Sequence, residues 1–311
     1  MPDEGVVLLV LEQCLNGLQF GVMLFLMAAG LTLVFGIMNL VNLAHGSLYM
    51  VGAYFATAAY TRTGSFLAGV AFALAATLAV GMLVEVIALR TLYERDHLDQ
   101  VLATFGLILF FNEAVAIVWG RTALFTTVPP ALAGHLTLLP GLRYPAYRAV
   151  IILVGLAVAL LLYVLVSRTR LGMLIRAGAS NRTMVAALGV NVRLLSTLVF
   201  GFGAALAALG GLMAGPIYTV QPGMGDDILI QVLVVIVIGG IGSIRGALVG
   251  AVVVGMVDTL GRAFLKPVLS GVIGPVAAND AGPALASMLI YILMAAVLYF
   301  RPQGLFPAAR G

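Results

Sequence analysis

The stretch Gly30–Tyr54 reads GLTLVFGIMNLVNLAHGSLYMVGAY, and the rest of the chain is organised around it. It is apolar up to Met38 and again towards Tyr54, but a polar interruption separates the two parts. The interrupting residues are Asn39, Asn42, His45, Gly46 and Ser47. In hydrocarbon, amide and imidazole groups need partners, so they are not expected to face lipid. The segment therefore either turns back at a membrane surface, or breaks inside the membrane and lines a wet cavity.

Composition places the chain among integral membrane proteins. Of its 311 residues, 62% are hydrophobic and only 9% are charged, whereas about 25% of residues are charged in soluble domains. The apolar runs are continuous, unlike the short alternating strands of an outer-membrane barrel. The expected fold is all-α: one polytopic helical membrane domain covering residues 1–311.

The apolar runs set the number of crossings, since a spanning helix needs about 20 residues. Two runs, Ile228–Ile241 and Ala247–Leu260, are short alone and too long together. The others are Leu15–Met38, Leu43–Tyr60, Phe66–Leu89, Val101–Trp119, Ala149–Val166, Leu194–Ala214 and Ala284–Phe300. We expect 8–9 transmembrane helices, with interrupted or re-entrant segments.

A second interruption, 239–246, reads GGIGSIRG. Glycines this dense break a helix or let another backbone approach closely. The stretch RGALVGA that follows at 245–251 resembles HGSLYMVGA at 45–53. Duplicated halves and chance both explain this likeness. The two interruptions provide the candidate residues of a substrate path or gate: Asn39, Asn42, His45, Gly46, Gly239, Gly240, Gly242 and Arg245.

Several functions are excluded by residues that the sequence lacks. The only lysine, Lys266, precedes Pro267, so the chain cannot contain the Gly-Lys-Ser/Thr of a Walker A loop. Cys14 is the single cysteine, and the three histidines lack metal-ligand spacing. Arginines stand in separate short loops, which argues against nucleic-acid binding. No catalytic set occurs, so the chain is not expected to be an enzyme or to hold a cofactor.

Ionisable residues inside the apolar runs are few. They are Glu85, Glu113, Asp258, Arg245 and His45. This set is too sparse for a proton relay, and structural and functional roles stay open for each. Asn39, Asn42 and His45 offer hydrogen-bonding groups without a fixed charge. They suit either the wall of a path for a small, partly apolar solute, or the caps of a broken helix.

The segment 168–193 reads RTRLGMLIRAGASNRTMVAALGVNVR and is too polar to cross a membrane. Leu171, Leu174 and Ile175 share one helical face, and Met184, Ala187 and Leu188 share another. Asn181 suits a turn and Gly189 a helix end. Two short amphipathic helices are expected, which either dock onto a cytosolic partner or pack on their own bundle.

Arginine placement predicts orientation. The segments 90–97 and 168–193 and the tail after Arg301 carry most arginines and belong on the cytoplasmic side. The N-terminus is then outside and the C-terminus inside, which requires an odd number of crossings. Both interruptions are expected at the cytoplasmic end, close to 168–193, where an inner gate would lie.

Four stretches resemble LivH-type permeases, membrane subunits of bacterial ATP-binding-cassette importers for branched-chain amino acids. They are the opening stretch, RAGASNRTMVAALGVNV, VLVVIVIGGIGSIRGALVGA and the tail RPQGLFP. They match in order between about residues 15 and 307. The Asn-x-x-His-Gly pattern at 42–46 favours the H-type subunit over its M-type paralogue.

The resemblance implies a permease subunit in the bacterial inner membrane, in contact with lipid. Its partners would be a LivM-like second permease, two cytosolic ATPases that bind ATP and Mg²⁺, and a periplasmic substrate-binding protein. The segment 168–193 would be the coupling loop, with the matching positions Arg176, Ala177, Asn181, Ala187 and Gly189. The alternatives are a family permease for urea, short amides or other amino acids, and a stand-alone secondary carrier or channel.

Overall fold

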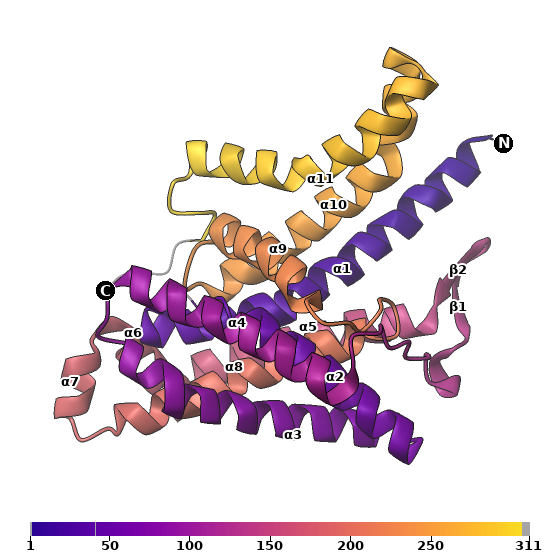
Figure 1. Ribbon diagram of the computed structural model, residues 1–311. Helices are drawn as coiled ribbons and strands as arrows, with labels where there is room; N and C mark the ends of the chain where they lie inside the picture. The colour runs from indigo at the N-terminus through magenta and orange to yellow at the C-terminus, as the bar shows by residue number, and fades with distance from the viewer. Residues whose placement is uncertain (1, 41, 307–311) are drawn as a thin grey trace.

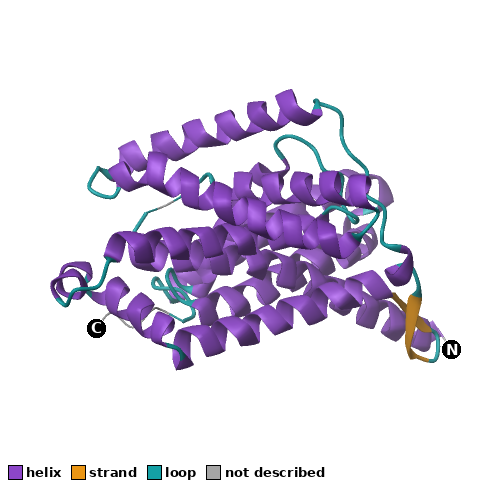
Figure 2. Cartoon of the chain, turned by 90° about the horizontal axis from the view of Figure 1, so that it is seen from below, coloured by secondary structure: helices purple, strands orange, loops and turns teal. Residues whose placement is uncertain are grey.

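The computed structural model describes residues 2–40 and 42–306, and most of them are helical (Figures 1 and 2). The long helices are α1 (Pro2–Met38), α2 (His45–Thr63), α3 (Phe66–Val84), α4 (His97–Trp119), α5 (Ala146–Arg168), α8 (Val192–Ala214), α9 (Met224–Gly239), α10 (Ile244–Ile273) and α11 (Pro275–Phe300). The short elements are η1 (Glu85–Leu89), η2 (Arg90–Leu92), η3 (Pro130–Leu132), α6 (Arg170–Ser180), α7 (Arg182–Ala187) and the antiparallel hairpin of β1 (His135–Leu139) and β2 (Leu142–Pro145).

Seven helices of the described chain are long and apolar enough to cross a membrane: α1, α3 with its extension to Leu92, α4, α5, α8, α10 and α11. The shorter α2 and α9 lie within the same bundle (Figure 1). The all-α polytopic class is therefore confirmed, and the count agrees roughly with the predicted eight or nine.

The bundle has two distinct ends (Figures 1 and 2). The N-terminus and the β-hairpin lie at one end, called here the hairpin end. The helices α6 and α7 lie at the opposite end, called the α6–α7 end, together with the C-terminal end of α11. The start of α1 and the end of α11 are thus on opposite sides of the bundle.

α1 and α8 form the centre of the bundle. In their most apolar windows, 83% and 72% of residues are buried, against 11% in α11 and 17% in α5. Small residues allow the central helices to approach each other: a Cβ added at Gly30 would lie 2.6 Å from the carbonyl oxygen of Gly203 in α8. Glycine contacts of this kind replace the hydrophobic effect as the source of helix association in lipid.

The helices α1–α3 and α8–α10 pack in matching ways. α3 packs on α2 and α8, while α10 packs on α9 and α1. α1 runs away from the hairpin end and α8 runs towards it (Figure 1). The structural counterpart of α2 is therefore α9, and the counterpart of the break 39–44 is the loop 215–223. The likeness between 45–53 and 245–251 pairs α2 with α10 instead, so it does not mark this repeat.

Candidate functional site

The predicted interruption after α1 is a true break of the helix inside the bundle. Asn39 is exposed and has φ 51°, a left-handed conformation that asparagine tolerates better than most residues. His45, the first residue of α2, lies beside Gly30, because a Cβ added there would be 2.9 Å from its Nε2. Gly30 precedes the end of α1 by eight residues, about 12 Å along the axis. The chain therefore turns back into the bundle before α2 begins.

α2 and α9 begin at the same buried point. A Cβ added at Gly46 would collide with the carbonyl oxygen of Gly225, and one added at Gly225 would collide with that of Gly46. The Gly223 amide also lies 3.3 Å from the Met50 sulfur. Each helix N-terminus carries a partial positive charge of roughly half a unit. Two such ends meet here in the interior.

Several buried polar atoms of α1, of the break and of the start of α2 lack protein partners in the described chain. His45 is 0% exposed and Asn42 is 1% exposed. Both ring nitrogens of His45, Nδ2 of Asn42, Oγ of Ser47 and Oγ1 of Thr32 lack a hydrogen-bond partner, while Oδ1 of Asn42 accepts from the Ala44 amide at 3.1 Å. Asn42 and His45 are thus buried in protein. Their role in a path remains a prediction.

The other predicted path residues lie in the turn between α9 and α10. Gly240 and Gly242 have φ values of 105° and 84°, which favour glycine. The C-terminal segment pairs with this end of α9, since the Leu305 and Phe306 amides donate to Ile238 and Gly239 at 2.8 and 2.9 Å. Gly239 packs on Gly246, and Arg245 is exposed, with its guanidinium 5.8 Å from the Tyr163 ring centroid. The structure therefore places the predicted path residues in two separate groups.

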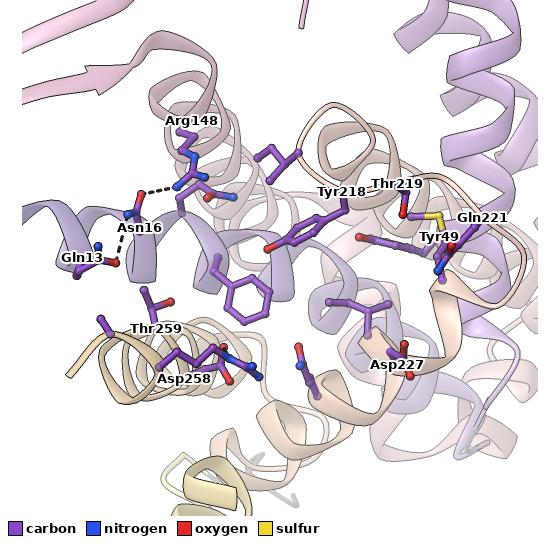
Figure 3. A pocket seen from close by; sticks show the side chains of 18 residues that line it. Gln13, Asn16, Tyr49, Arg148, Tyr218, Thr219, Gln221, Asp227, Asp258 and Thr259 are labelled. Atoms are coloured by element: carbon purple, nitrogen blue, oxygen red, sulfur yellow. Dashed lines mark hydrogen bonds and ion pairs between the residues drawn. The ribbon is translucent and has the colours of Figure 1, made fainter. Parts of the chain in front are cut away.

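An open cavity of about 730 Å³ lies beside the start of α9 (Figure 3). Its walls come from the N-terminal half of α1, Tyr49 of α2, the first turn of α5, the loop 215–223, and parts of α9 and α10. The lining residues are Gln13, Asn16, Gln19, Phe20, Tyr49, Arg148, Ile217, Tyr218, Thr219, Gln221, Met224, Asp227, Ile228, Gln231, Asp258, Thr259, Arg262 and Ala263.

None of the predicted path residues is in this lining. Two sequence signals could have indicated one wall each: Gln13, Asn16 and Gln19 recur at three-residue spacing along α1, and Asp258 and Arg262 are four residues apart. Both signals look like ordinary helix-surface patterns when each is considered alone. The cavity arises only when six segments are packed together.

Hydrogen bonds order both sides of the cavity (Figure 3). On one side, Arg148 donates to Oδ1 of Asn16 at 2.6 Å. On the other, Nε of Arg262 donates to Oδ2 of Asp258 at 2.9 Å, while Oδ1 of Asp258 is buried and has no partner in the described chain. Tyr218 projects its hydroxyl into the space between them. Burial raises the pKa of the Tyr218 hydroxyl, and the charges of Arg148, Asp258 and Arg262 also act on it.

The two other carboxylates in the apolar runs have different surroundings. Glu113 forms an exposed ion pair with Arg121 at 2.7 Å. Glu85 is 0% exposed. Of the three membrane carboxylates predicted from the sequence, only Asp258 lines the cavity.

Glu85 is the centre of a polar network near the α6–α7 end. Its carboxylate accepts from Arg90 at 2.9 Å, from the Thr197 hydroxyl at 2.7 Å and from the Tyr93 hydroxyl at 2.8 Å. Burial and the hydrogen bond to Glu85 raise the pKa of Tyr93. Arg182 of α7 lies over the Tyr93 ring. A buried carboxylate with three donors is fully satisfied, which indicates a structural link between α3, α8 and α7.

The segment 168–193 contains the two short helices expected from its sequence, α6 and α7. Asn181 ends α6 and caps α7, accepting from the Met184 amide at 2.9 Å. Gly189 has φ 85° and terminates α7. The exposed apolar side chains here are Leu171, Met173, Met184 and Leu188. Of the predicted coupling residues, Arg176, Asn181, Ala187 and Gly189 are exposed and Ala177 is half-buried.

Comparison with known proteins identifies the family. Residues 13–298 match the model described as "Branched-chain amino acid transport system / permease component". The chain belongs to this permease family. The permease is 30% identical to the high-affinity branched-chain amino acid transport system permease protein BraD of Pseudomonas aeruginosa, over 95% of each chain. It is 29% identical to LivH of Escherichia coli K12, over 82% of this chain and 87% of that one.

A more distant relative is the probable branched-chain amino acid transport permease protein LivH of Methanocaldococcus jannaschii. It is 28% identical, with 76% of each chain covered. No solved structure matches the permease. The predicted LivH-type resemblance is therefore confirmed, and permeases of this family are transport components rather than enzymes. Within the described residues, no group of His, Cys, Asp and Glu side chains could hold a metal ion.

Proposed function

We propose that this permease forms the path by which an ATP-driven importer moves branched-chain or similar apolar amino acids across the bacterial inner membrane. The observation that carries the proposal is the open cavity beside the N-termini of α2 and α9, which pack against each other, in a chain of this family. Broken helices with buried ends are a recurrent feature of substrate paths in transporters. The substrate class is that in the names of BraD and LivH.

In this proposal the hairpin end faces outward and the α6–α7 end faces the cytoplasm. The arginines support this orientation, because positive residues gather in cytoplasmic loops. Five of them stand in or beside α6 and α7: Arg168, Arg170, Arg176, Arg182 and Arg193. The cavity, lined by the N-terminal half of α1 and the start of α5, then belongs to the outer half of the path. The break at 39–44 follows the end of α1 that lies on the proposed cytoplasmic side.

The proposal includes the partners that the family resemblance implies. Two cytosolic ATPases bind ATP and Mg²⁺, and α6 and α7 are the docking segment for the ATPases. The exposed apolar side chains of that segment, Leu171, Met173, Met184 and Leu188, suit a groove on such a partner. A LivM-like second permease completes the membrane assembly, and a periplasmic binding protein delivers substrate at the hairpin end. Asn42, His45 and the 239–245 turn act as inner-gate elements.

Reconstitution tests this function directly. Liposomes carrying this permease, the second permease and both ATPases are expected to take up leucine only with the binding protein outside and ATP inside. Omitting any one component is the control. Leucine uptake by this chain alone, driven by an ion gradient and indifferent to ATP, would instead establish a stand-alone carrier. Urea uptake without leucine uptake would overturn the substrate class.

A further inference from the structure

The outer stripe of α4 is the set of residues on this helix that face away from the bundle. They are exposed and recur every three or four positions: Leu102, Gly106, Leu109, Glu113 and Ile117. The opposite face of α4 is buried and packs on α2 through Phe111 and Val115. Because α4 is long and apolar enough to cross a membrane, the outer stripe lies at membrane depth.

Glu113 places a carboxylate on this stripe. Its side chain is 59% exposed and pairs at 2.7 Å with Arg121, which is 76% exposed. Glu113 precedes Trp119, the last residue of α4, by six residues, about 9 Å along the helix axis. Tryptophan is typical of the membrane–water interface, so Glu113 lies below that level. Ionisable side chains within membrane helices almost always face protein or a water-filled cavity rather than lipid.

Gly106 is a second, independent sign of a protein neighbour. Nothing in the described chain lies within 4 Å of a Cβ added there. Small residues in membrane helices mark places where another helix approaches closely, and inside this bundle Gly155 of α5 packs against Val22 of α1 in that way. Gly106 and Glu113 are seven residues apart, about two turns, so one approaching helix can contact both.

α5 shows how a lipid-facing surface of this chain differs from the outer stripe. α4 and α5 are similarly peripheral, since 22% and 17% of residues are buried in their most apolar windows. No charged residue stands in 149–167 of α5, and its Gly155 is buried. Its most exposed apolar side chains are four leucines: Leu153, Leu156, Leu160 and Leu161. The charge and the unpacked glycine therefore distinguish α4 from an ordinary lipid-facing helix.

Asn112, the neighbour of Glu113, connects α4 to the start of α9. Its Nδ2 donates to Oδ2 of Asp226 at 3.1 Å, and Asp226 belongs to the first turn of α9. The next residue, Asp227, lines the open cavity. A partner that contacts Glu113 is thus one residue away from a hydrogen bond that holds the start of α9.

We propose that the outer stripe of α4 is the surface on which the second permease subunit packs. The occupant is a membrane helix that approaches closely at Gly106 and presents a hydrogen-bond donor or a positive charge to Glu113. This inference rests on the proposed function, which includes that subunit, and adds the surface. A second copy of this chain fits less well. In a two-fold pair the same stripe would meet itself, so two Glu113 carboxylates would face each other and repel.

Photo-crosslinking tests the surface in the complete transporter. A benzophenone derivative of phenylalanine replaces Leu109, in the middle of the outer stripe, or Leu160 of α5. The two leucine side chains are 54% and 64% exposed, respectively. The second permease and an additional copy of this chain carry different epitope tags. We expect the Leu109 probe to give an adduct with the second permease and the Leu160 probe to give no protein adduct.

Variants measure what the two features contribute. The apparent Kd of the two permeases is obtained from energy transfer between fused fluorescent proteins as the liposome lipid is diluted. Glu113→Leu and Gly106→Leu are each expected to raise this Kd by roughly 10- to 100-fold, the scale for losing a hydrogen bond to a charged group or for overpacking. Contact with lipid predicts no weakening, because leucine suits lipid better than glutamate does.

Gly271→Leu is the matched control and should leave the Kd unchanged, since nothing lies within 4 Å of a Cβ added at this exposed glycine of α10. A monodisperse peak in detergent verifies that each variant is folded. If one variant fails this check, the other variant and the crosslinks decide.

Three results would overturn the inference: an adduct between two copies of this chain, equal adduct yields from the Leu109 and Leu160 probes, or an unchanged Kd in the folded variants. Leucine uptake by the unsubstituted transporter is measured in the same liposomes. Normal uptake together with any of these results refutes the surface and leaves the proposed function standing. Absence of uptake, or of energy transfer between the unsubstituted permeases, refutes the proposed function itself.

Discussion

The guanidinium of Arg182 lies 4.9 Å from the ring centroid of Tyr93, and the Tyr93 hydroxyl donates to Glu85 at 2.8 Å. The same hydroxyl is 3.3 Å from the sulfur of Met38, the last residue of α1. One side chain thus joins α7 to the helix end at which the 39–44 break begins. If ATPases dock on α6 and α7, a displacement of α7 reaches the break through Tyr93.

Tyr93→Phe keeps the ring beneath Arg182 and removes one donor from the buried Glu85 carboxylate. A hydrogen bond to a charged group contributes about 1.5–3 kcal/mol, so the free energy of unfolding is expected to fall by this amount. Denaturant titration in detergent micelles measures it. Tyr60→Phe, on a tyrosine outside this network, is the control. An unfolding curve that Tyr93→Phe leaves unchanged would show that the hydroxyl does not stabilise Glu85.

Gly46→Ala and Gly225→Ala are each expected to destabilise the bundle, because the added methyl group collides with the backbone carbonyl of the facing glycine. Overpacking typically lowers the free energy of unfolding by about 1–3 kcal/mol. Here neither backbone can make room for the methyl group unless a whole helix moves. The yield of folded, monodisperse protein after detergent extraction measures the effect. Gly36→Ala is the matched control, since nothing lies within 4 Å of its added Cβ. Equal yields for all three variants would mean that α2 and α9 do not meet as closely as described.

Leu188→Asp is expected to weaken ATPase binding at least about tenfold while the permease still inserts. Leu188 is 77% exposed, and burying one leucine side chain in an interface contributes about 1.5–3 kcal/mol. Pull-down of the ATPases by detergent-solubilised permease measures the affinity. Leu136→Asp makes the same change at the hairpin end, where Leu136 is 46% exposed, and should bind ATPase normally. Undiminished binding by Leu188→Asp would exclude α7 from the docking surface.

Gly189→Val is expected to lower the amount of leucine transported per ATP hydrolysed. Gly189 has φ 85°, a conformation closed to β-branched side chains but tolerated by asparagine. Gly189→Asn should therefore retain most of the coupling. Comparing Gly189→Val with Gly189→Asn distinguishes the effect of the backbone conformation from the effect of side-chain size. Uptake and ATP hydrolysis are measured in the same proteoliposomes. Normal coupling in Gly189→Val would remove this position from the coupling loop.

Local sequence predicted the features that depend on neighbours along the chain. Apolar runs identified the membrane helices, since hydrocarbon accepts only segments that satisfy their own backbone. Asn39, Asn42 and His45 identified the break after α1. In 168–193, the spacing of apolar residues, a capping asparagine and a terminal glycine predicted α6 and α7.

The same reasoning left open whether the glycine-rich stretch 239–246 matches the break after α1. The packing of the helices instead pairs 39–44 with 215–223. The loop 215–223 lacks a run of polar residues inside an apolar segment, so hydropathy gives no sign that α9 begins inside the bundle. That position depends on the contact between Gly46 and Gly225.

By itself, then, the sequence determined the class of protein, its family, the break after α1 and the two helices of the segment 168–193. Only the tertiary structure decided that α2 and α9 start at one point and that a cavity lies beside them. The physical reason is that hydropathy and capping act between residues a few positions apart. The cavity instead needs Asn16, Arg148 and Asp258, which are distant in the sequence and are brought together by helices that pack through their glycines.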